Sequence, residues 1–455
     1  MTRPGRWLCC AAALSTAAGA LAGWRPMLLG VLSAAAVLTW GLLAVDRLNY
    51  VLLAVLVFVP VTVNPGYPIS PVWMVLLAGT AIALLGRLAR LDPHAPVASI
   101  GLVAFVLPVT CVFAAMVRWS GLRDLVIGVL PFGCYAMIAW HLVDEGRRAP
   151  ATFVRLARTL AWAGLPVAAL AIYQRATGSW PILDDFATSN AYTSTAAAGR
   201  SAGTMGHPII YGTYCMVAVC IAVTLRGRLW QVPFAAGAVG LLLSGSRSAW
   251  IGTAAALVVW YFAQPRKVTK RGIQLVMSGA VVAVVLLVTS PPPVRDLIDM
   301  VRGRLSNVTG SSSAAARFER SAQAWSGVSD SLVGLLFGQG PEAHVRFFQQ
   351  IGVADGLAQT FDNSYLTLWY DFGALTLLAF AAVLVATLVR GSSLTARILI
   401  VGFAIQIWFF DFYLWPSAAA ALLLAVALEP ATSSAARQTY HAGTSPEPVL
   451  AAPSR

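Results

Sequence analysis

The feature that most constrains the fold is a nearly continuous series of apolar runs, most of them about 16 to 25 residues long. A helix needs about 20 mainly apolar residues to cross the hydrocarbon core of a bilayer. Of the 455 residues, 58% are hydrophobic and only 11% are charged, too little charge to cover a soluble domain of this length. The sequence therefore predicts an all-α integral membrane protein with about 12 to 14 transmembrane helices.

The apolar runs set the expected helix boundaries, and the last two runs could form one broken helix. Pro60 and Pro108 lie inside runs and are expected to kink them. Met1–Gly23 begins with basic residues and could be a signal peptide, but we favour a retained helix because the next run follows at once. We expect helices at 7–22, 26–45, 48–62, 72–88, 98–117, 123–142, 156–175, 207–225, 229–244, 248–263, 272–289, 363–389, 397–411 and 413–429.

The chain divides into three regions by composition. Residues 1–175 are expected to form N-terminal transmembrane helices. Residues 176–429 hold the unusual polar segments, including a large loop at 290–361, and form the expected catalytic region. Residues 430–455 are rich in Ala, Ser, Thr and Pro and are expected to be a disordered cytoplasmic tail.

Basic residues occur in alternate connections, and this pattern predicts the orientation in the membrane. Arginine and lysine accumulate in cytoplasmic loops, so these connections and both termini are expected inside. The net charge of +13 then reflects loops that face anionic lipid, and we expect no nucleic-acid partner. The basic connections carry Arg47; Arg87 and Arg90; Arg147, Arg148 and Arg155; Arg226 and Arg228; Arg266, Lys267, Lys270 and Arg271; and Arg390 with Arg397.

Because successive helices cross the membrane in opposite directions, the cytoplasmic placement of the basic connections puts every unusual polar segment of the second half on the extracytoplasmic face. These segments are loop 176–206, the turn Ser244–Ser248, loop 290–361 and the helix start at Asp362. The loop 290–361 carries five arginines near its start. A large basic loop on one side of a bilayer favours an anionic ligand there.

Four features on this face carry the candidate chemistry. Arginine suits a diphosphate because its planar fork donates two charge-assisted hydrogen bonds and stays protonated. The nearby glycines allow backbone N–H groups to approach an anion. The features are Arg200 with His207-Pro208; Ser244-Gly-Ser-Arg247-Ser248; Arg317-Phe-Glu-Arg320 with Trp325 and Gly338-Gln339-Gly340; and Asp362-Asn363 followed by Tyr370-Asp371-Phe372-Gly373.

Each feature also has a purely structural interpretation. Arg247 could extend to lipid headgroups, and His207-Pro208 could simply start a helix. Asp362 and Asn363 are good helix N-caps. Gly338-Gln339-Gly340 is weak as a phosphate loop because it lacks the surrounding motif. The occurrence of all four on one side favours the functional interpretation.

The cysteines and histidines give no indication of a disulfide framework or a metal site. All six cysteines lie in apolar runs and are expected to be packing residues. The five histidines have no ligand spacing, and the chain has no Asp-x-Asp motif. We expect no metal and no cofactor.

At these residues the chain resembles the O-antigen ligase and O-antigen polymerase superfamily, from about Arg200 to Gly373. The resemblance rests on the Arg-x-x-Gly segment before His207-Pro208 and on the run that ends Leu-Leu-Leu-Ser-Gly-Ser-Arg-Ser. It also rests on Arg317 upstream of Trp325 and Gly-x-Gly, and on Asp362-Asn363 with Gly373 ten residues after the Asn. Residues 1–175 match only as hydrophobic helices.

This resemblance implies a metal-independent, helical membrane glycosyltransferase that uses no nucleotide sugar. Such enzymes take a glycan from an undecaprenyl diphosphate carrier at the outer face of the inner membrane. The ligase transfers it to a lipid acceptor, and the polymerase to another carrier-linked glycan. Ligases carry His-Asn where this chain has Asp362-Asn363, so we favour polymerisation or transfer of a cell-surface polysaccharide over O-antigen ligation.

We expect Arg200 and Arg317 to stabilise the departing diphosphate, with Arg247 in support. Asp362 would orient or deprotonate the acceptor hydroxyl, with inversion at the anomeric carbon. The remaining predicted substrate-binding residues are His207, Arg320, Asn363 and Trp325. The competing classes are a multi-helix transporter or flippase of lipid-linked glycan, a peptidoglycan polymerase and a non-enzymatic scaffold. A transporter would show charged residues at mid-membrane or repeated broken helices, which this sequence lacks.

Overall fold

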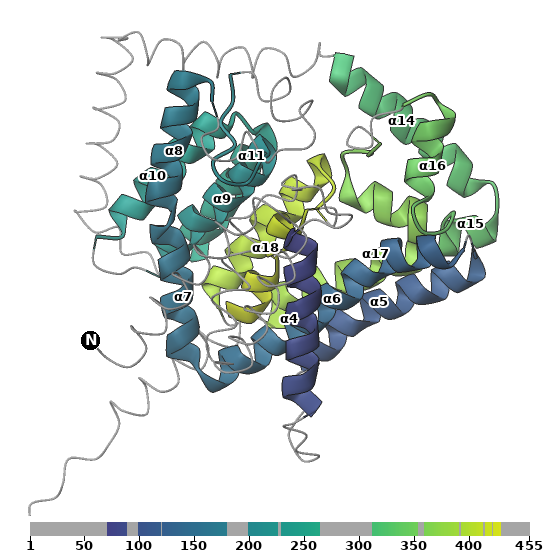
Figure 1. The fold of residues 1–455 in the computed structure, drawn as a ribbon, viewed down its shortest axis with the longest axis horizontal. Coiled ribbons are helices and arrows are strands. Elements are labelled where there is room, and N and C mark those ends of the chain that lie inside the picture. Colours follow the sequence, from purple (N-terminus) through teal and green to yellow (C-terminus); the bar gives the residue numbers. More distant parts are fainter. Residues whose placement is uncertain are drawn as a thin grey trace, which may run out of the picture.

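The computed structural model describes ten stretches of the chain, and these confirm the all-α fold (Figure 1). The described residues form helices and contain no strand. The predicted helices 7–22, 26–45, 48–62 and 272–289 and the tail 430–455 lie outside them. The described residues are 71–88, 99–119, 121–179, 199–225, 229–263, 312–353, 359–390, 393–412, 415–420 and 422–428.

Most helices coincide with the predicted apolar runs. In the first half they are α4 (Pro71–Leu88), α5 (Ser99–Val117), α6 (Leu122–Arg148), α7 (Pro150–Trp162), α8 (Gly164–Thr177), α9 (Pro208–Thr224), α10 (Gln231–Ser244) and α11 (Arg247–Ala263). The second half has α14 (Ser312–Ser329), α15 (Leu332–Phe337), α16 (Ala343–Gln350), α17 (Ser364–Arg390), α18 (Leu394–Gln406) and the short 3-10 helix η5 (Ile407–Phe409). A further apolar helix covers Pro416–Leu428.

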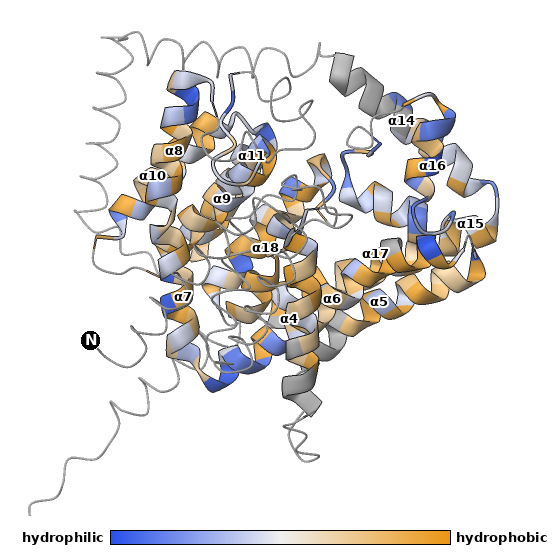
Figure 2. Cartoon of the chain, viewed as in Figure 1, coloured by the Kyte–Doolittle hydropathy of each residue, from blue (hydrophilic) through white to orange (hydrophobic). Residues whose placement is uncertain are grey.

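Length and composition identify an integral membrane protein. Three segments, Leu122–Arg148, Pro150–Thr177 and Ser364–Val389, are long and apolar enough to cross a membrane. The described residues also form several shorter apolar helices. Figure 2 shows hydrophobic colour along most of α5, α6, α9 and α17, whereas hydrophilic colour gathers on α14, α16 and the helix ends.

The two largest differences from the predicted boundaries lie at the junction of α6 and α7. The helix expected at 123–142 continues to Arg148, where Arg148 pairs with Asp144 one turn earlier at 2.9 Å. Pro150 then starts α7, as is common for proline at a first helical position. The helix expected at 156–175 begins at Pro150 and is divided at Ala163 into α7 and α8.

Helix α9 is the centre of the first group of helices, and nearly all its residues are buried. It packs against α7, α10, α11 and α18. Small residues allow this close approach: a Cβ at Gly240 of α10 would lie 2.5 Å from the Tyr211 hydroxyl oxygen. In the contact between α9 and α18, the Gln406 side-chain amide donates to the Thr213 hydroxyl at 2.7 Å.

The polar segments meet at one end of the helices, which we call the site end. The Ser201 N–H donates to the Leu243 carbonyl at 3.0 Å, so the start of α9 lies beside the end of α10. The His207 ring lies 5.1 Å from the Trp415 ring, and the Phe412 N–H donates to the Ser364 hydroxyl at the start of α17 at 2.9 Å. Segments far apart in sequence thus converge at the site end.

Candidate functional site

Arg200 lies against the turn that joins α10 to α11. Its Nε–H donates to the Ser244 carbonyl at 2.8 Å. Gly245 has φ 57°, and a Cβ there would lie 3.3 Å from Arg200 Cγ, so glycine gives the arginine stem room. The next residue, Ser201, donates from its hydroxyl to the Ala171 carbonyl of α8 at 2.7 Å. Hydrogen bonds to α8 and α10 therefore hold this segment in place.

Arg247 is the first residue of α11 and belongs to the turn that Arg200 contacts. Serine side chains close this turn. The Ser246 and Ser248 hydroxyls lie 3.1 Å apart, and the Ser246 N–H donates to the Ser244 hydroxyl at 3.2 Å. The structure thus brings the Arg200 segment and the Ser244–Ser248 turn together. Two arginines, Arg200 and Arg247, lie at this one turn.

His207 is the N-cap of α9, as the structural interpretation of His207-Pro208 predicts. Its Nδ1 accepts from the Ile209 N–H at 3.3 Å, and the ring is buried. Burial, followed by the nearby Arg200 charge, lowers the pKa of His207 from 6.5 to about 3. The imidazole is therefore neutral at physiological pH and offers hydrogen bonds rather than a positive charge.

Asn363, and not Asp362, caps α17. The Asn363 side-chain oxygen accepts from the Tyr365 N–H at 3.1 Å and from the Leu366 N–H at 3.2 Å. Asp362 precedes the cap at φ 53° and is partly exposed. Its carboxylate accepts from the Thr360 hydroxyl at 3.3 Å. A non-glycine residue at positive φ is costly and recurs at functional sites.

This division between neighbours gives a testable contrast. Asn363→Ala should destabilise the protein by about 1 kcal/mol, because two backbone N–H groups lose their acceptor. Asp362→Asn should leave the melting temperature nearly unchanged, because asparagine also tolerates positive φ, and it should lower glycan-product formation. Thermal unfolding in detergent and product yield measure the two effects. A destabilised Asp362→Asn with normal turnover per folded molecule would make the residue structural.

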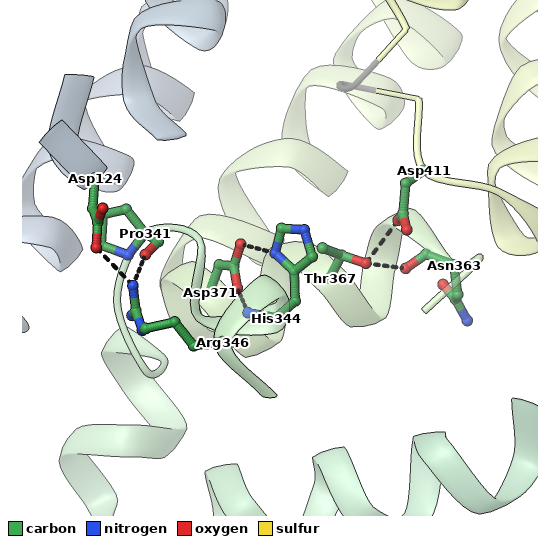
Figure 3. A network of polar contacts seen from close by, with 8 residues as sticks. All are labelled: Asp124, Pro341, His344, Arg346, Asn363, Thr367, Asp371 and Asp411. Carbon is green, nitrogen blue, oxygen red and sulfur yellow. Dashed lines mark hydrogen bonds and ion pairs between the residues drawn. The ribbon is translucent and has the colours of Figure 1, made fainter. Parts of the chain in front are cut away.

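Asp411 is a buried carboxyl group beside the cap, and the sequence prediction did not include it. It lies in the connection between η5 and the helix Pro416–Leu428, with 2% of its surface exposed. The Thr367 hydroxyl donates to Asp411 Oδ1 at 2.7 Å (Figure 3). The Ser364 hydroxyl donates to the Phe410 carbonyl at 2.6 Å and so fixes the connection to the start of α17.

Burial raises the pKa of Asp411 from 3.8 to about 7. The Thr367 hydrogen bond and the His344 charge lower the pKa, whereas the Asp362 and Asp371 charges raise it. The available sequence signal was a lone acidic residue in an otherwise uncharged connection between two apolar runs.

His344 and Asp371 form a buried pair that links α16 to α17 (Figure 3). His344 Nδ1 lies 2.6 Å from one Asp371 carboxylate oxygen, and the His344 backbone N–H donates to the other at 2.9 Å. Burial lowers the pKa of His344, but the charge of Asp371 and its hydrogen bond outweigh this and leave the pKa above 6.5. His344 was not a predicted site residue, and Asp371 was named only as part of the fourth sequence feature, because the pair joins segments that are separate in sequence.

The Gly338-Gln339-Gly340 segment is hydrogen-bonded to α17 at a break in that helix. Helix α17 has non-helical backbone at Gly373, with φ 77° and ψ −179°. The break leaves two carbonyls available: Tyr370 O accepts from the Gln339 N–H at 2.8 Å, and Asp371 O accepts from the Gly340 N–H at 3.0 Å. These N–H groups are therefore engaged within the protein, so the weak phosphate-loop interpretation is wrong.

A second anchor joins α16 to α6. Arg346 donates to the Asp124 carboxylate at 2.8 Å and to the Pro341 carbonyl at 2.9 Å (Figure 3). We call the segment Leu332–Gln350 the docked segment, because both α6 and α17 hold it.

The remaining predicted residues lie on α14. Trp325 is 60% exposed, and its ring centroid lies 4.7 Å from that of the buried Trp369 on α17. An exposed ring with a rigid backing is a suitable surface for a sugar face. Arg317 and Arg320 are on the same helix, and their side chains lie outside the described part of the structure.

Residues 232–381 match the family model described as O-antigen ligase. This match supports the O-antigen ligase and polymerase superfamily. The match runs from α10 into α17 and includes Arg247, Trp325 and Asp362, and it identifies a glycan-transferring type of membrane enzyme. No curated protein matches the chain.

Three candidate site residues lie outside the matched residues. Arg200 and His207 precede residues 232–381, and Asp411 follows them. Contacts with the Ser244 turn and the Ser364 helix start bring all three to the site end.

Proposed function

We propose that this superfamily member polymerises or transfers an undecaprenyl-diphosphate-linked glycan at the outer face of the cytoplasmic membrane. Its donor is the polyprenyl-diphosphate-linked glycan, and its acceptor is another glycan or a lipid. The product is a cell-surface polysaccharide. The observation that carries this proposal is the convergence of Arg200, the Arg247 turn and Asp362 at one end of an O-antigen ligase-type helix bundle.

The arginines would act on the leaving group. When the bond between the anomeric carbon and the diphosphate breaks, negative charge develops on the diphosphate, and fixed cations lower the energy of that state. Arg200 is already positioned by Ser244, and Arg247 starts the adjoining helix. We assign Arg317 to the same diphosphate from the sequence pattern.

Asp362 would hold the acceptor hydroxyl on the opposite face of the sugar, giving inversion without a metal. Its partial exposure and its position before the helix cap suit a residue that contacts a substrate. Trp325 offers a stacking surface for the glycan, with Arg320 and Asn363 as further polar contacts.

A small apolar pocket near the site end has room for only a short part of a polyprenyl tail. It lies between α5, α6, α17 and the helix Pro416–Leu428, and its lining includes Leu107, Phe132, Val383 and Leu423. It reaches Phe412, whose backbone N–H is hydrogen-bonded to Ser364 at the site end. A lipid tail in this pocket would have its diphosphate end near the predicted polar residues.

We infer the orientation from the basic residues at the opposite end. Arg158 of α7 donates to the Leu225 carbonyl at the far end of α9 at 3.0 Å, and Arg147 and Arg148 end α6. Cytoplasmic loops are rich in such residues, so the site end would face the outside and both termini the cytoplasm.

Analysis of surface glycan length in a deletion strain tests this function. Loss of long chains with single repeat units retained is the result expected of a polymerase. Long carrier-linked chains that remain unattached would favour the alternative, ligation to a lipid or other acceptor. Carrier-linked glycan that stays on the cytoplasmic side would favour a flippase, and unchanged surface glycan would refute the proposal.

A further inference from the structure

One oxygen of the buried Asp411 carboxyl has no hydrogen-bond partner within the part of the chain that the structure describes. The other oxygen accepts from the Thr367 hydroxyl at 2.7 Å. A buried polar oxygen without a partner is costly, and native structures keep such groups mainly where a ligand, an ion or water satisfies them. Asp411 Oδ2 therefore marks a place where a hydroxyl group of a ligand would be stabilised.

The position of Asp411 connects this oxygen to the proposed reaction centre. The extended connection Phe410–Phe412 is hydrogen-bonded on both sides to Ser364, two residues after Asp362. The Asp362 charge also raises the pKa of Asp411. On the other side of the connection, Trp415 contacts the His207 ring, which lies near Arg200. Asp411 thus lies between the arginine-bearing segments and the Asp362 helix start.

We propose that Asp411 accepts the proton of the acceptor hydroxyl during glycan transfer, while Asp362 positions that hydroxyl. This inference rests on the proposed function. The acceptor oxygen forms the new bond to the anomeric carbon, and the bond from that carbon to the diphosphate oxygen breaks with its electron pair left on the diphosphate. The hydroxyl proton moves to Asp411 Oδ2 and then to solvent, which restores the carboxylate.

The surroundings suit this role better than those of an ordinary surface carboxylate. A base near pKa 4 is weak at neutral pH, whereas burial brings the pKa of Asp411 to about 7. The charged and titratable groups that act on it are His344 of α16, Asp371 of α17 and Asp362 before α17. In Figure 3, Thr367 lies between His344 and Asp411, with its hydroxyl directed to the Asp411 carboxylate.

Asp411→Asn is the main test because asparagine has the same shape and can still accept from Thr367. The assay uses purified protein and carrier-linked repeat units extracted from the deletion strain. We expect the transfer rate to fall by about 10²-fold or more, as for loss of a general base. The wild-type rate should fall as the pH drops below about 7, because protonated Asp411 cannot accept a proton. In Asp411→Asn this fall in rate at low pH, the acid limb of the pH profile, should be absent.

Thr367→Val is the matched second variant, because it retains the carboxyl and removes its hydrogen bond. That bond lowers the pKa of Asp411, so its loss should move the acid limb to higher pH without abolishing activity. A purely structural tie between α17 and the connection would change the melting temperature and leave the pH profile unmoved.

The outcomes separate the two proposals. If wild-type protein neither lengthens nor transfers the carrier-linked units, the proposed function fails. If wild type is active and Asp411→Asn keeps more than about a third of its rate with the same pH profile, only the Asp411 role is wrong. Should Asp411→Asn not fold, an unmoved acid limb in Thr367→Val overturns the inference and a shifted limb supports it.

Discussion

Arg200→Ala is expected to reduce long-chain glycan about 10²- to 10³-fold while the protein still accumulates in the membrane. The reason is the loss of a fixed cation at the point where the leaving diphosphate gains charge. The side chain also donates to the Ser244 carbonyl, and that single bond contributes only about 1 kcal/mol to stability. Glycan electrophoresis, normalised to protein level, measures the effect. Arg200→Lys should recover only part of the activity, because lysine lacks the planar fork.

Arg175 provides a matched control from the same end of the molecule. It too donates to a backbone carbonyl, that of Gly199 next to Arg200, at 2.6 Å, but it is exposed and has no assigned role. Arg175→Ala should therefore leave glycan length nearly unchanged. Equal losses from both variants would show that Arg200 acts only by holding the segment, and the diphosphate role would have to be withdrawn.

Gly373→Ala is expected to give the largest loss of stability among single substitutions at the site. Its φ of 77° and ψ of −179° belong to a region that only glycine occupies readily. A Cβ there would also collide with the Leu336 carbonyl oxygen of α15. Backbone strain and the collision together should cost about 2 to 6 kcal/mol. We expect a lower melting temperature in detergent and loss of long-chain product.

Gly352→Ala is the control that introduces backbone strain without a steric collision. Gly352 also has a positive φ, 82°, but nothing lies within 4 Å of a Cβ built there. This variant should be only mildly destabilised and should remain active. A Gly373→Ala protein as stable as Gly352→Ala would show that the docked segment is not held closely against the break in α17.

The sequence predicted the helices well and the contacts between segments only in part. Apolar length is a property of each run, so α4, α5, α9, α10 and α11 appear within a few residues of the expected boundaries. The division at Ala163 was missed because the prediction rested on apolar length, although Gly164 and Pro166 follow it directly. The predicted break between 397–411 and 413–429 is present, and it carries Asp411.

The missed residues owe their character to tertiary contacts. Asp411 and His344 become buried and change pKa only through neighbours on other segments, which a single sequence does not pair. The role of Gly338-Gln339-Gly340 was missed for the same reason. Its partners are carbonyls exposed by a helix break whose only local sign is Gly373. By contrast, the cap at Asn363 was among the stated possibilities, since capping depends on adjacent residues.

The attachment of the docked segment to α17 also constrains the order of biogenesis. Gln339, Gly340 and His344 are synthesised before Tyr370 and Asp371, yet their backbone N–H groups depend on acceptors from those later residues. The docked segment must therefore wait for its final partners until α17 has been synthesised. Chains cut short before residue 364 would leave these N–H groups without their acceptors, so the final arrangement of the segment depends on the synthesis of α17.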